Sequence, residues 1–285
     1  MPSGIKSSGF ETFSHSLPNG YRMVVHRLSK WKRVAVSRLS LHYPSLLRFL
    51  PTPRPFHIRR HSYEGLSSLR DLLICLPGIG DEAKDFEDWG FVDFVRAHGW
   101  AADVLLVDAH YGYYADRTFL GQLRQDVLLP AASSGYRSVW LAGISLGGLG
   151  ALLYASQHQQ DVHGVVAVAP FLGTDTVVRE IALAGGLAQW TTTITPSDEI
   201  RTVWSWIRSH GERNASPPNI FLAFGENDIF VDAHRLLAST LPAAHVLTAP
   251  GGHRWPVWQQ LWMQFLRRHI PADVHKPRPA ELSGS

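Results

Sequence analysis

The sequence predicts an α/β fold, a three-layer α/β/α sandwich around a mostly parallel sheet with a small cap insertion. Short, fully apolar runs alternate with amphipathic helical patterns from residue 71 onward, which is typical of a parallel sheet covered by helices on both faces. A Gly-x-Ser-x-Gly sequence connects one apolar run to a helical pattern of small residues. The 285 residues, 45% of them hydrophobic, suffice for one such domain with an insertion.

The expected strands and helices can be placed in order along the chain. The apolar runs predict strands at 72–76, 104–107, 139–142, 165–169, 220–224 and 246–249. Apolar residues that recur three and four positions apart predict helices at 86–98, 120–128, 149–154, 233–241 and 256–269. The last helix has Pro256 in its first turn and basic residues at its C-terminal end, where positive charge is favourable.

The Gly-x-Ser-x-Gly sequence consists of Gly143, Ile144, Ser145, Leu146 and Gly147. Between a strand and a helix, this pattern predicts a sharp turn that exposes a nucleophilic serine at the tip of the strand. The two glycines are expected where side chains would collide. The following helix begins beside Ser145, where its N-terminus favours developing negative charge.

A serine hydroxyl is a weak nucleophile, so it needs a base that is oriented by an acid. In a parallel sheet, catalytic groups gather at the carboxyl ends of the strands. His253 follows the strand expected at 246–249, and Asp228 follows the one expected at 220–224. The chain order Ser145, Asp228, His253 therefore predicts a catalytic triad.

Other residues compete for these roles. Asp228 could instead cap the helix that follows it, which would leave Glu226 as the acid, and Asp175 follows an earlier strand. His110 also follows a strand, and it either lines the site or has a structural role.

His57 and His61 stand four residues apart, as metal ligands on a helix do. No acidic residue lies between them, and the neighbouring Arg59 and Arg60 would repel a cation. We therefore expect neither a metal site nor a cofactor.

Residues from about 72 to 269 resemble an α/β-hydrolase-fold serine esterase. The sequences Gly-Ile-Ser-Leu-Gly-Gly-Leu-Gly-Ala and Gly-Gly-His-Arg-Trp-Pro-Val-Trp are similar to those of the branch that includes feruloyl- and esterase D-like enzymes. Arg254 departs from that branch, in which the residue after the histidine is often acidic. The resemblance implies an oxyanion hole in the loop 77–80, Pro-Gly-Ile-Gly here, with the backbone amides of Ile79 and Leu146 as donors.

These features predict a serine hydrolase that cleaves a carboxylic ester through an acyl-enzyme intermediate. A thioesterase or acyltransferase on the same triad is the alternative, as is a non-catalytic binding protein, although a binding protein has no need of all three residues. The expected partner is a small-molecule ester. Nucleic acid is not expected, because the sequence has no basic groove interleaved with aromatic residues.

The expected organisation is a basic N-terminal extension at 1–63, a catalytic domain at 64–270 with a cap insertion at 171–218, and a disordered tail at 271–285. Gly185-Gly186 is a candidate hinge of the cap. Three tryptophans of the cap could either form an apolar substrate pocket or pack its helices onto the core; they are Trp190, Trp204 and Trp206.

The extension carries eleven Lys and Arg but a single acidic residue, Glu11. It resembles an organelle transit peptide or an arm for an anionic membrane surface, and a solvated extension or an early start codon is the alternative. An opening hairpin is expected around Asn19-Gly20, and 31–55 is expected either to form a surface helix or to cover the sheet edge. Without a transmembrane or signal segment, the expected compartment is the cytoplasm.

Overall fold

The computed structural model describes residues 52, 54–65, 69–195, 197–212 and 218–270. Their middle layer is a seven-stranded sheet in the order β1-β3-β2-β4-β5-β6-β7. Neighbouring strands are parallel except for β1 and β3. The strands are β1 (Ile58–His61), β2 (Asp71–Leu76), β3 (Ala102–Val107), β4 (Val139–Ile144), β5 (Gly164–Val168), β6 (Asn219–Gly225) and β7 (Val246–Ala249).

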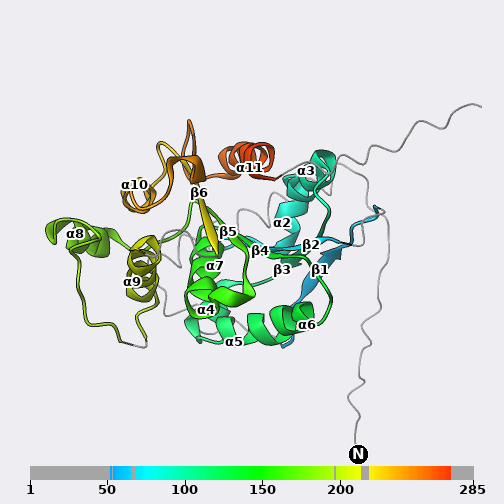
Figure 1. Ribbon diagram of the computed structural model, residues 1–285, viewed down its shortest axis with the longest axis horizontal. Helices are drawn as coiled ribbons and strands as arrows, with labels where there is room; N and C mark the ends of the chain where they lie inside the picture. Colours follow the sequence, from blue (N-terminus) through cyan, green and yellow to red (C-terminus); the bar gives the residue numbers. More distant parts are fainter. Residues whose placement is uncertain (1–51, 53, 66–68, 196, 213–217, 271–285) are drawn as a thin grey trace, which may run out of the picture.

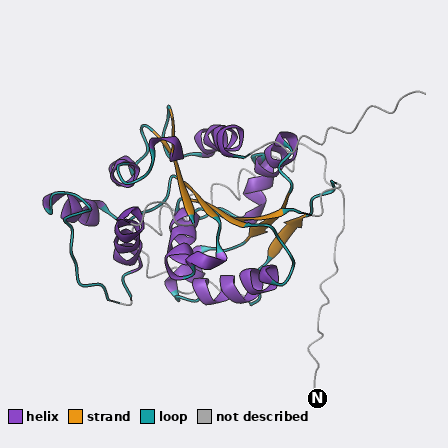
Figure 2. Cartoon of the chain, viewed as in Figure 1, coloured by secondary structure: helices purple, strands orange, loops and turns teal. Residues whose placement is uncertain are grey.

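Helices cover both faces of this sheet (Figure 1), and Figure 2 shows the strands between two helical layers. One face is packed by α2 (Ala83–Asp88), α3 (Phe91–His98) and α11 (Trp255–His269). The other carries α4 (Tyr111–Ala115), α5 (Phe119–Leu123), η2 (Arg124–Leu128), α6 (Leu129–Ala132), α7 (Leu146–Gln157), α8 (Asp175–Leu183), α9 (Glu199–Glu212) and α10 (Val231–Ala238). Short 3-10 turns are η3 (Gln159–Asp161) and η4 (Ala243–His245). The expected three-layer α/β/α architecture is confirmed.

Each central strand is buried on both faces. In β2, Leu72 and Ile74 belong to the core on the α7 side, whereas Leu73 and Cys75 belong to the core on the α11 side. Successive side chains of a strand point to opposite faces. A strand covered twice must therefore be apolar throughout, which explains the apolar runs in the sequence.

The helix expected at 86–98 is two helices, so that prediction is wrong in part. Gly90 separates α2 from α3 and has a φ of 73°. This left-handed backbone cannot continue a right-handed helix, and glycine adopts it without a steric penalty. The chain therefore turns at Gly90 and packs two short helices rather than one long one on this face.

Strand β1 lies inside the stretch expected to be an extension. It pairs with β3 in an antiparallel register that runs from Ile58 opposite Val107 to His61 opposite Val104. The sheet therefore begins before residue 64, and the boundary expected at residue 63 is too late. The hairpin expected at Asn19-Gly20, the stretch 31–51 and the tail at 271–285 lie outside the described residues.

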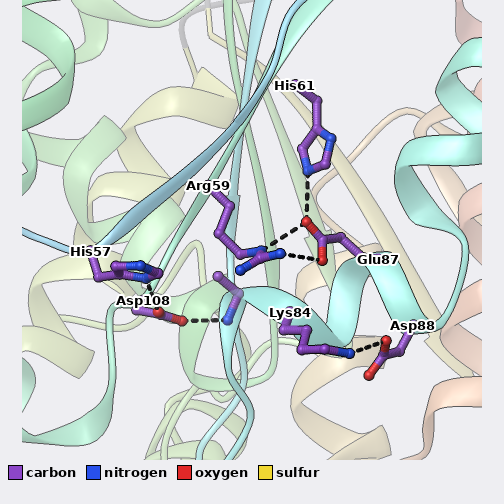
Figure 3. A network of polar contacts seen from close by, with 8 residues as sticks. His57, Arg59, His61, Lys84, Glu87, Asp88 and Asp108 are labelled. Carbon is purple, nitrogen blue, oxygen red and sulfur yellow. Dashed lines mark hydrogen bonds and ion pairs between the residues drawn. The ribbon is translucent and has the colours of Figure 1, made fainter. Parts of the chain in front are cut away.

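Polar contacts attach β1 to α2 (Figure 3). Arg59 donates from Nε and Nη2 to the two carboxylate oxygens of Glu87, each at 2.8 Å, and His61 Nε2 lies 2.9 Å from Glu87 Oε1. Lys84 pairs with Asp88 on the same helix. In the described part of the chain, no three or more His, Cys, Asp or Glu side chains gather as metal ligands would.

None of the helices that the structure describes has both the length and the apolar character that crossing a bilayer requires.

Candidate active site

Ser145 lies in a strained turn at the carboxyl end of β4. Its φ is 53° and its ψ is −111°, a conformation that residues with a Cβ rarely adopt and that costs on the order of 1–3 kcal/mol. Helix α7 begins at the next residue, Leu146. The Ser145 side chain therefore stands where the strand ends and the positive end of a helix begins.

Two glycines allow this turn to form. A Cβ on Gly143 would lie 2.0 Å from the carbonyl oxygen of Gly147, and a Cβ on Gly147 would lie 2.1 Å from the carbonyl oxygen of Leu76. Both contacts are with backbone, which cannot rotate away. The start of α7 can therefore lie directly against β4 and β2 only if both positions are glycine.

Gly147→Ala is expected to lower the free energy of unfolding by at least about 2 kcal/mol, because the added methyl group overpacks against a fixed carbonyl. Gly121→Ala is the matched control. A Cβ at Gly121, in α5, meets no heavy atom of the described residues within 4 Å, and alanine favours a helix by up to about 1 kcal/mol. Urea denaturation of both variants measures the difference. Equal stability would show that the turn at Ser145 tolerates a side chain at position 147.

The structure brings Ser145, His253 and Asp228 together. His253 Nε2 lies 3.0 Å from Ser145 Oγ, and His253 Nδ1 lies 2.9 Å and 3.1 Å from the two carboxylate oxygens of Asp228. Ser145 is 4% exposed and Asp228 is 3% exposed. A base within reach of a serine hydroxyl, with its other nitrogen held by a buried carboxylate, is the arrangement that activates a serine nucleophile.

Aromatic rings fix the orientation of the histidine. His253 makes edge-to-face contacts with Phe230 at 5.2 Å and with Trp258 at 4.9 Å between ring centroids. Its side chain keeps 17% of its surface exposed. The imidazole is thus held on two sides and still reaches solvent.

Asp228 is the carboxylate that the fold places beside His253. Its carboxylate also accepts the backbone N–H of Phe230 at 2.9 Å, so it closes the turn before α10, although the residue at the N-cap is Phe230. Glu226 and Asp175, the other candidates, are exposed, and Asp175 is the first residue of α8. The sequence permits all three carboxylates, and the geometry favours Asp228.

The loop expected to form the oxyanion hole runs beside the serine. A Cβ on Gly78 would lie 3.5 Å from the Cβ of Ser145. Ile79 is half-buried and packs against the core on the α7 side. Leu146 is the first residue of α7, and the first N–H groups of a helix have no partner inside the helix.

Two aspartates that the sequence analysis missed hold the end of this loop and the start of α2 that follows it. The Asp81 amide donates to the Gly78 carbonyl at 3.2 Å, and Asp81 Oδ1 accepts the indole N–H of Trp255 at 3.1 Å. Asp108 accepts the Ala83 amide at 2.5 Å. Asp108 directly follows β3, so the rule that located Asp228 at a strand end could have found it.

Asp108 also contacts the exposed His57, whose Nδ1 lies 2.7 Å from Asp108 Oδ2 (Figure 3). His110 is the N-cap residue of α4, because its Nδ1 accepts the Gly112 amide at 3.1 Å. The structure thus gives it a structural role. Neither histidine of the stretch 57–61 lies on a helix, which removes the spacing argument for a metal there.

The tryptophans in 171–218 pack inside the described structure. Trp190 and Trp204 are buried in the core on the α7 side. The Trp204 indole donates to the Leu172 carbonyl at 2.9 Å, and the Trp190 indole donates to Glu180 at 2.9 Å. Gly185 and Gly186 form the turn after α8, with φ of 88° and 107°. These contacts favour packing over pocket lining for both tryptophans.

Comparison with known proteins agrees with this architecture. The family model described as serine aminopeptidase, S33, matches residues 123–251, which is less than half of the chain. No curated protein matches the sequence.

Similar solved structures include Est1E from Butyrivibrio proteoclasticus, at 13% identity and a TM-score of 0.52 over 74% of this chain and 91% of that one. A ferulic acid esterase has 14% identity and a TM-score of 0.51 over 73% and 90%. An esterase of Pyrobaculum calidifontis has 16% identity and a TM-score of 0.50 over 88% and 97%. These likenesses show that the chain has the α/β-hydrolase fold.

Proposed function

We propose that the protein is a serine hydrolase that cleaves carboxylic esters through an acyl-enzyme intermediate. The observation that carries this proposal is the continuous contact from Ser145 Oγ through His253 to the buried Asp228. In this arrangement the hydroxyl has a base, and the base has a fixed orientation.

The first half of the proposed reaction forms the acyl-enzyme. Ser145 Oγ attacks the ester carbonyl carbon while His253 Nε2 takes the hydroxyl proton, which gives a tetrahedral intermediate with a negative oxygen. The intermediate collapses, the bond from carbon to the leaving oxygen breaks, and His253 returns the proton to the departing alcohol. Asp228 stabilises the imidazolium between these two transfers.

The second half repeats the sequence with water. His253 removes a proton from a water molecule that attacks the acyl carbon, and then protonates Ser145 Oγ as the acid leaves. The amides of Ile79 and Leu146 are the proposed donors to the negative oxygen in both halves. Each such donor typically contributes about 3–4 kcal/mol to transition-state stabilisation.

Trp255→Phe is expected to lower kcat about tenfold, because it removes the indole N–H that holds Asp81 and with it the loop of Ile79. Hydrogen bonds to charged groups contribute about 1.5–3 kcal/mol, and about 1.4 kcal/mol is a tenfold rate change. Steady-state kinetics measures the change in kcat. Phenylalanine keeps the aromatic packing of Trp255 against Phe86 and Phe91.

Trp100→Phe is the matched control for this variant. The Trp100 indole also donates to a buried carboxylate, Asp71, at 2.8 Å, but Asp71 begins β2 at the opposite end of the strand from the loop. Trp100→Phe is expected to lose stability and keep kcat. An equal fall of kcat in both variants would mean that general destabilisation, and not the loop, sets the rate.

The experiment that tests the proposed function compares three leaving groups on one acyl chain: a p-nitrophenyl ester, an alkyl thioester and a p-nitroanilide. The proposal expects the ester to give the highest kcat/KM, and a chain-length series of p-nitrophenyl esters then sizes the acyl pocket. The anilide is included because the matching family model carries an aminopeptidase description.

Three results would change the proposal. Preference for the thioester would make the protein a thioesterase, and ester exchange in the presence of an alcohol, in place of acid release, would make it an acyltransferase. No turnover together with no labelling of Ser145 by a fluorophosphonate would refute a serine hydrolase and leave a binding role.

A further inference from the structure

The segment that follows β5 holds both backbone groups of the nucleophile. The Ser145 amide donates to the Val168 carbonyl at 2.9 Å, and the Phe171 amide donates to the Ser145 carbonyl at 2.9 Å. Between these two contacts, Ala169 has a φ of 46°. Two backbone hydrogen bonds therefore join the strained turn at Ser145 to a second strained turn, which spans 168–171.

Helix α10 supplies a buried histidine that holds this second turn. His234 Nε2 lies 2.9 Å from the Pro170 carbonyl oxygen. A carbonyl oxygen only accepts hydrogen bonds, so Nε2 carries the proton. Pro170 also packs against the start of α7, because a Cβ on Gly148 would lie 2.9 Å from the Pro170 Cβ.

A histidine at position 234 lowers the stability of the folded protein. It is 0% exposed, and its Nδ1 is buried and finds no hydrogen-bond partner among the described residues. An unsatisfied buried polar atom destabilises the folded state, and leucine at the same place would have no such atom. Burial lowers the pKa of His234 below its ordinary value, so the ring stays neutral and keeps the donor at Nε2.

A packing contact links the same helix to the triad. The ring of Phe230, at the start of α10, contacts His253 at 5.2 Å and Phe171 at 5.3 Å between centroids. His234 lies one helical turn later, with its amide bonded to the Phe230 carbonyl at 3.1 Å. The start of α10 therefore touches the base through Phe230 and the turn behind the nucleophile through His234.

We propose that His234 is a positioning residue: its hydrogen bond to the Pro170 carbonyl fixes the turn 168–171, and this turn holds the strained backbone that aims Ser145 Oγ at His253. The inference rests on the proposed serine hydrolase activity and adds a residue that touches neither Ser145 nor His253. Without the bond, the turn can relax and carry the nucleophile away from its base.

His234→Leu tests the proposal, since leucine fills the site and removes the donor. We expect kcat per active site to fall by about 10²-fold, the size of effect that small misplacements of reacting groups produce, while KM changes little. The rate of labelling by a fluorophosphonate should fall in parallel. The pH profile of kcat/KM should keep its position, because His253 remains the base.

Two further variants separate positioning from stability. His234→Gln can place an amide donor near the position of Nε2 and should recover most of kcat. His234→Asn has an amide too short to reach Pro170 and should behave like His234→Leu. If His234→Leu fails to fold, the comparison of Gln with Asn carries the test, with thermal melting to show that both are folded.

The outcomes distinguish the two proposals. Wild-type kcat in a folded His234→Leu or His234→Asn protein, or a His234→Gln protein as impaired as His234→Asn, would overturn the positioning role alone. A wild-type protein that neither turns over an ester nor is labelled by a fluorophosphonate would overturn the proposed function and this inference with it.

Discussion

Ser145→Ala should lower kcat for the preferred ester by about 10⁶-fold, the loss that removal of the nucleophile causes in a serine triad. The fold should survive, because alanine keeps the Cβ and the backbone contacts of Ser145 do not involve its side chain. Among the described residues, the variant loses the bond from Oγ to His253 Nε2, and the partly exposed imidazole can bond water instead. Initial rates at matched protein concentration, with circular dichroism, measure both effects.

Ser145→Gly, compared with Ser145→Ala, measures the backbone strain at position 145. Glycine also lacks the nucleophile, so activity should be lost equally. Glycine relieves strain of about 1–3 kcal/mol at a φ of 53°, against an entropic cost of about 0.5–1 kcal/mol. The glycine variant should therefore be more stable than the alanine variant, which would show that the nucleophile's conformation is held at the expense of stability.

Substantial turnover by Ser145→Ala would contradict the proposed mechanism. Contaminating host esterases are the usual source of such residual rates, so the intact mass after fluorophosphonate treatment must be recorded. Wild type should gain one phosphonyl adduct on the peptide that contains Ser145, and the alanine variant should gain none there.

The central sheet and the meeting of Ser145, Asp228 and His253 could be predicted because both follow from local rules. A strand covered on two faces must be apolar, so the apolar runs within β2 to β6 stand out in the sequence, whereas the edge strand β7 is shorter and exposes Thr248. Chemistry at a parallel sheet gathers at strand ends, so looking just after β6 and β7 led to Asp228 and His253. The same rule at β3 would have led to Asp108.

Other features depend on contacts between distant residues. Strand β1 is an edge strand whose Arg59 and His61 pair with Glu87 of α2, so it has no apolar run to reveal it. His234 lies in an ordinary amphipathic helical pattern, and its importance depends on a carbonyl 64 positions away in the chain. No local pattern encodes such a contact.

Asp228→Asn should lower kcat by about 10⁴-fold with little change in structure. The reason lies in the second hydrogen bond of the carboxylate. The Phe230 N–H donates to Asp228 Oδ1 at 2.9 Å, so in the variant it selects the asparagine oxygen for that position. The NH₂ group must then face His253 Nδ1, where Oδ2 lies at 2.9 Å in the wild type.

A donor opposite Nδ1 forces the proton of the neutral imidazole onto Nε2, the nitrogen that faces Ser145. Nε2 can then no longer accept the serine proton, so the base is present but in the wrong tautomer. Steady-state kinetics with wild type and Asp228→Asn, both shown to be folded by thermal melting, measures the loss.

Glu226→Gln is the matched control. It also removes one negative charge, but Glu226 is exposed and stands two residues before Asp228. It should change kcat by less than about twofold, since a screened surface charge has little effect. The reverse pattern, an active Asp228→Asn and an inactive Glu226→Gln, would transfer the role of the acid to Glu226. If both variants stay active, Asp175→Asn becomes the decisive variant, and its loss of activity would require the start of α8 to reach His253 in the working enzyme.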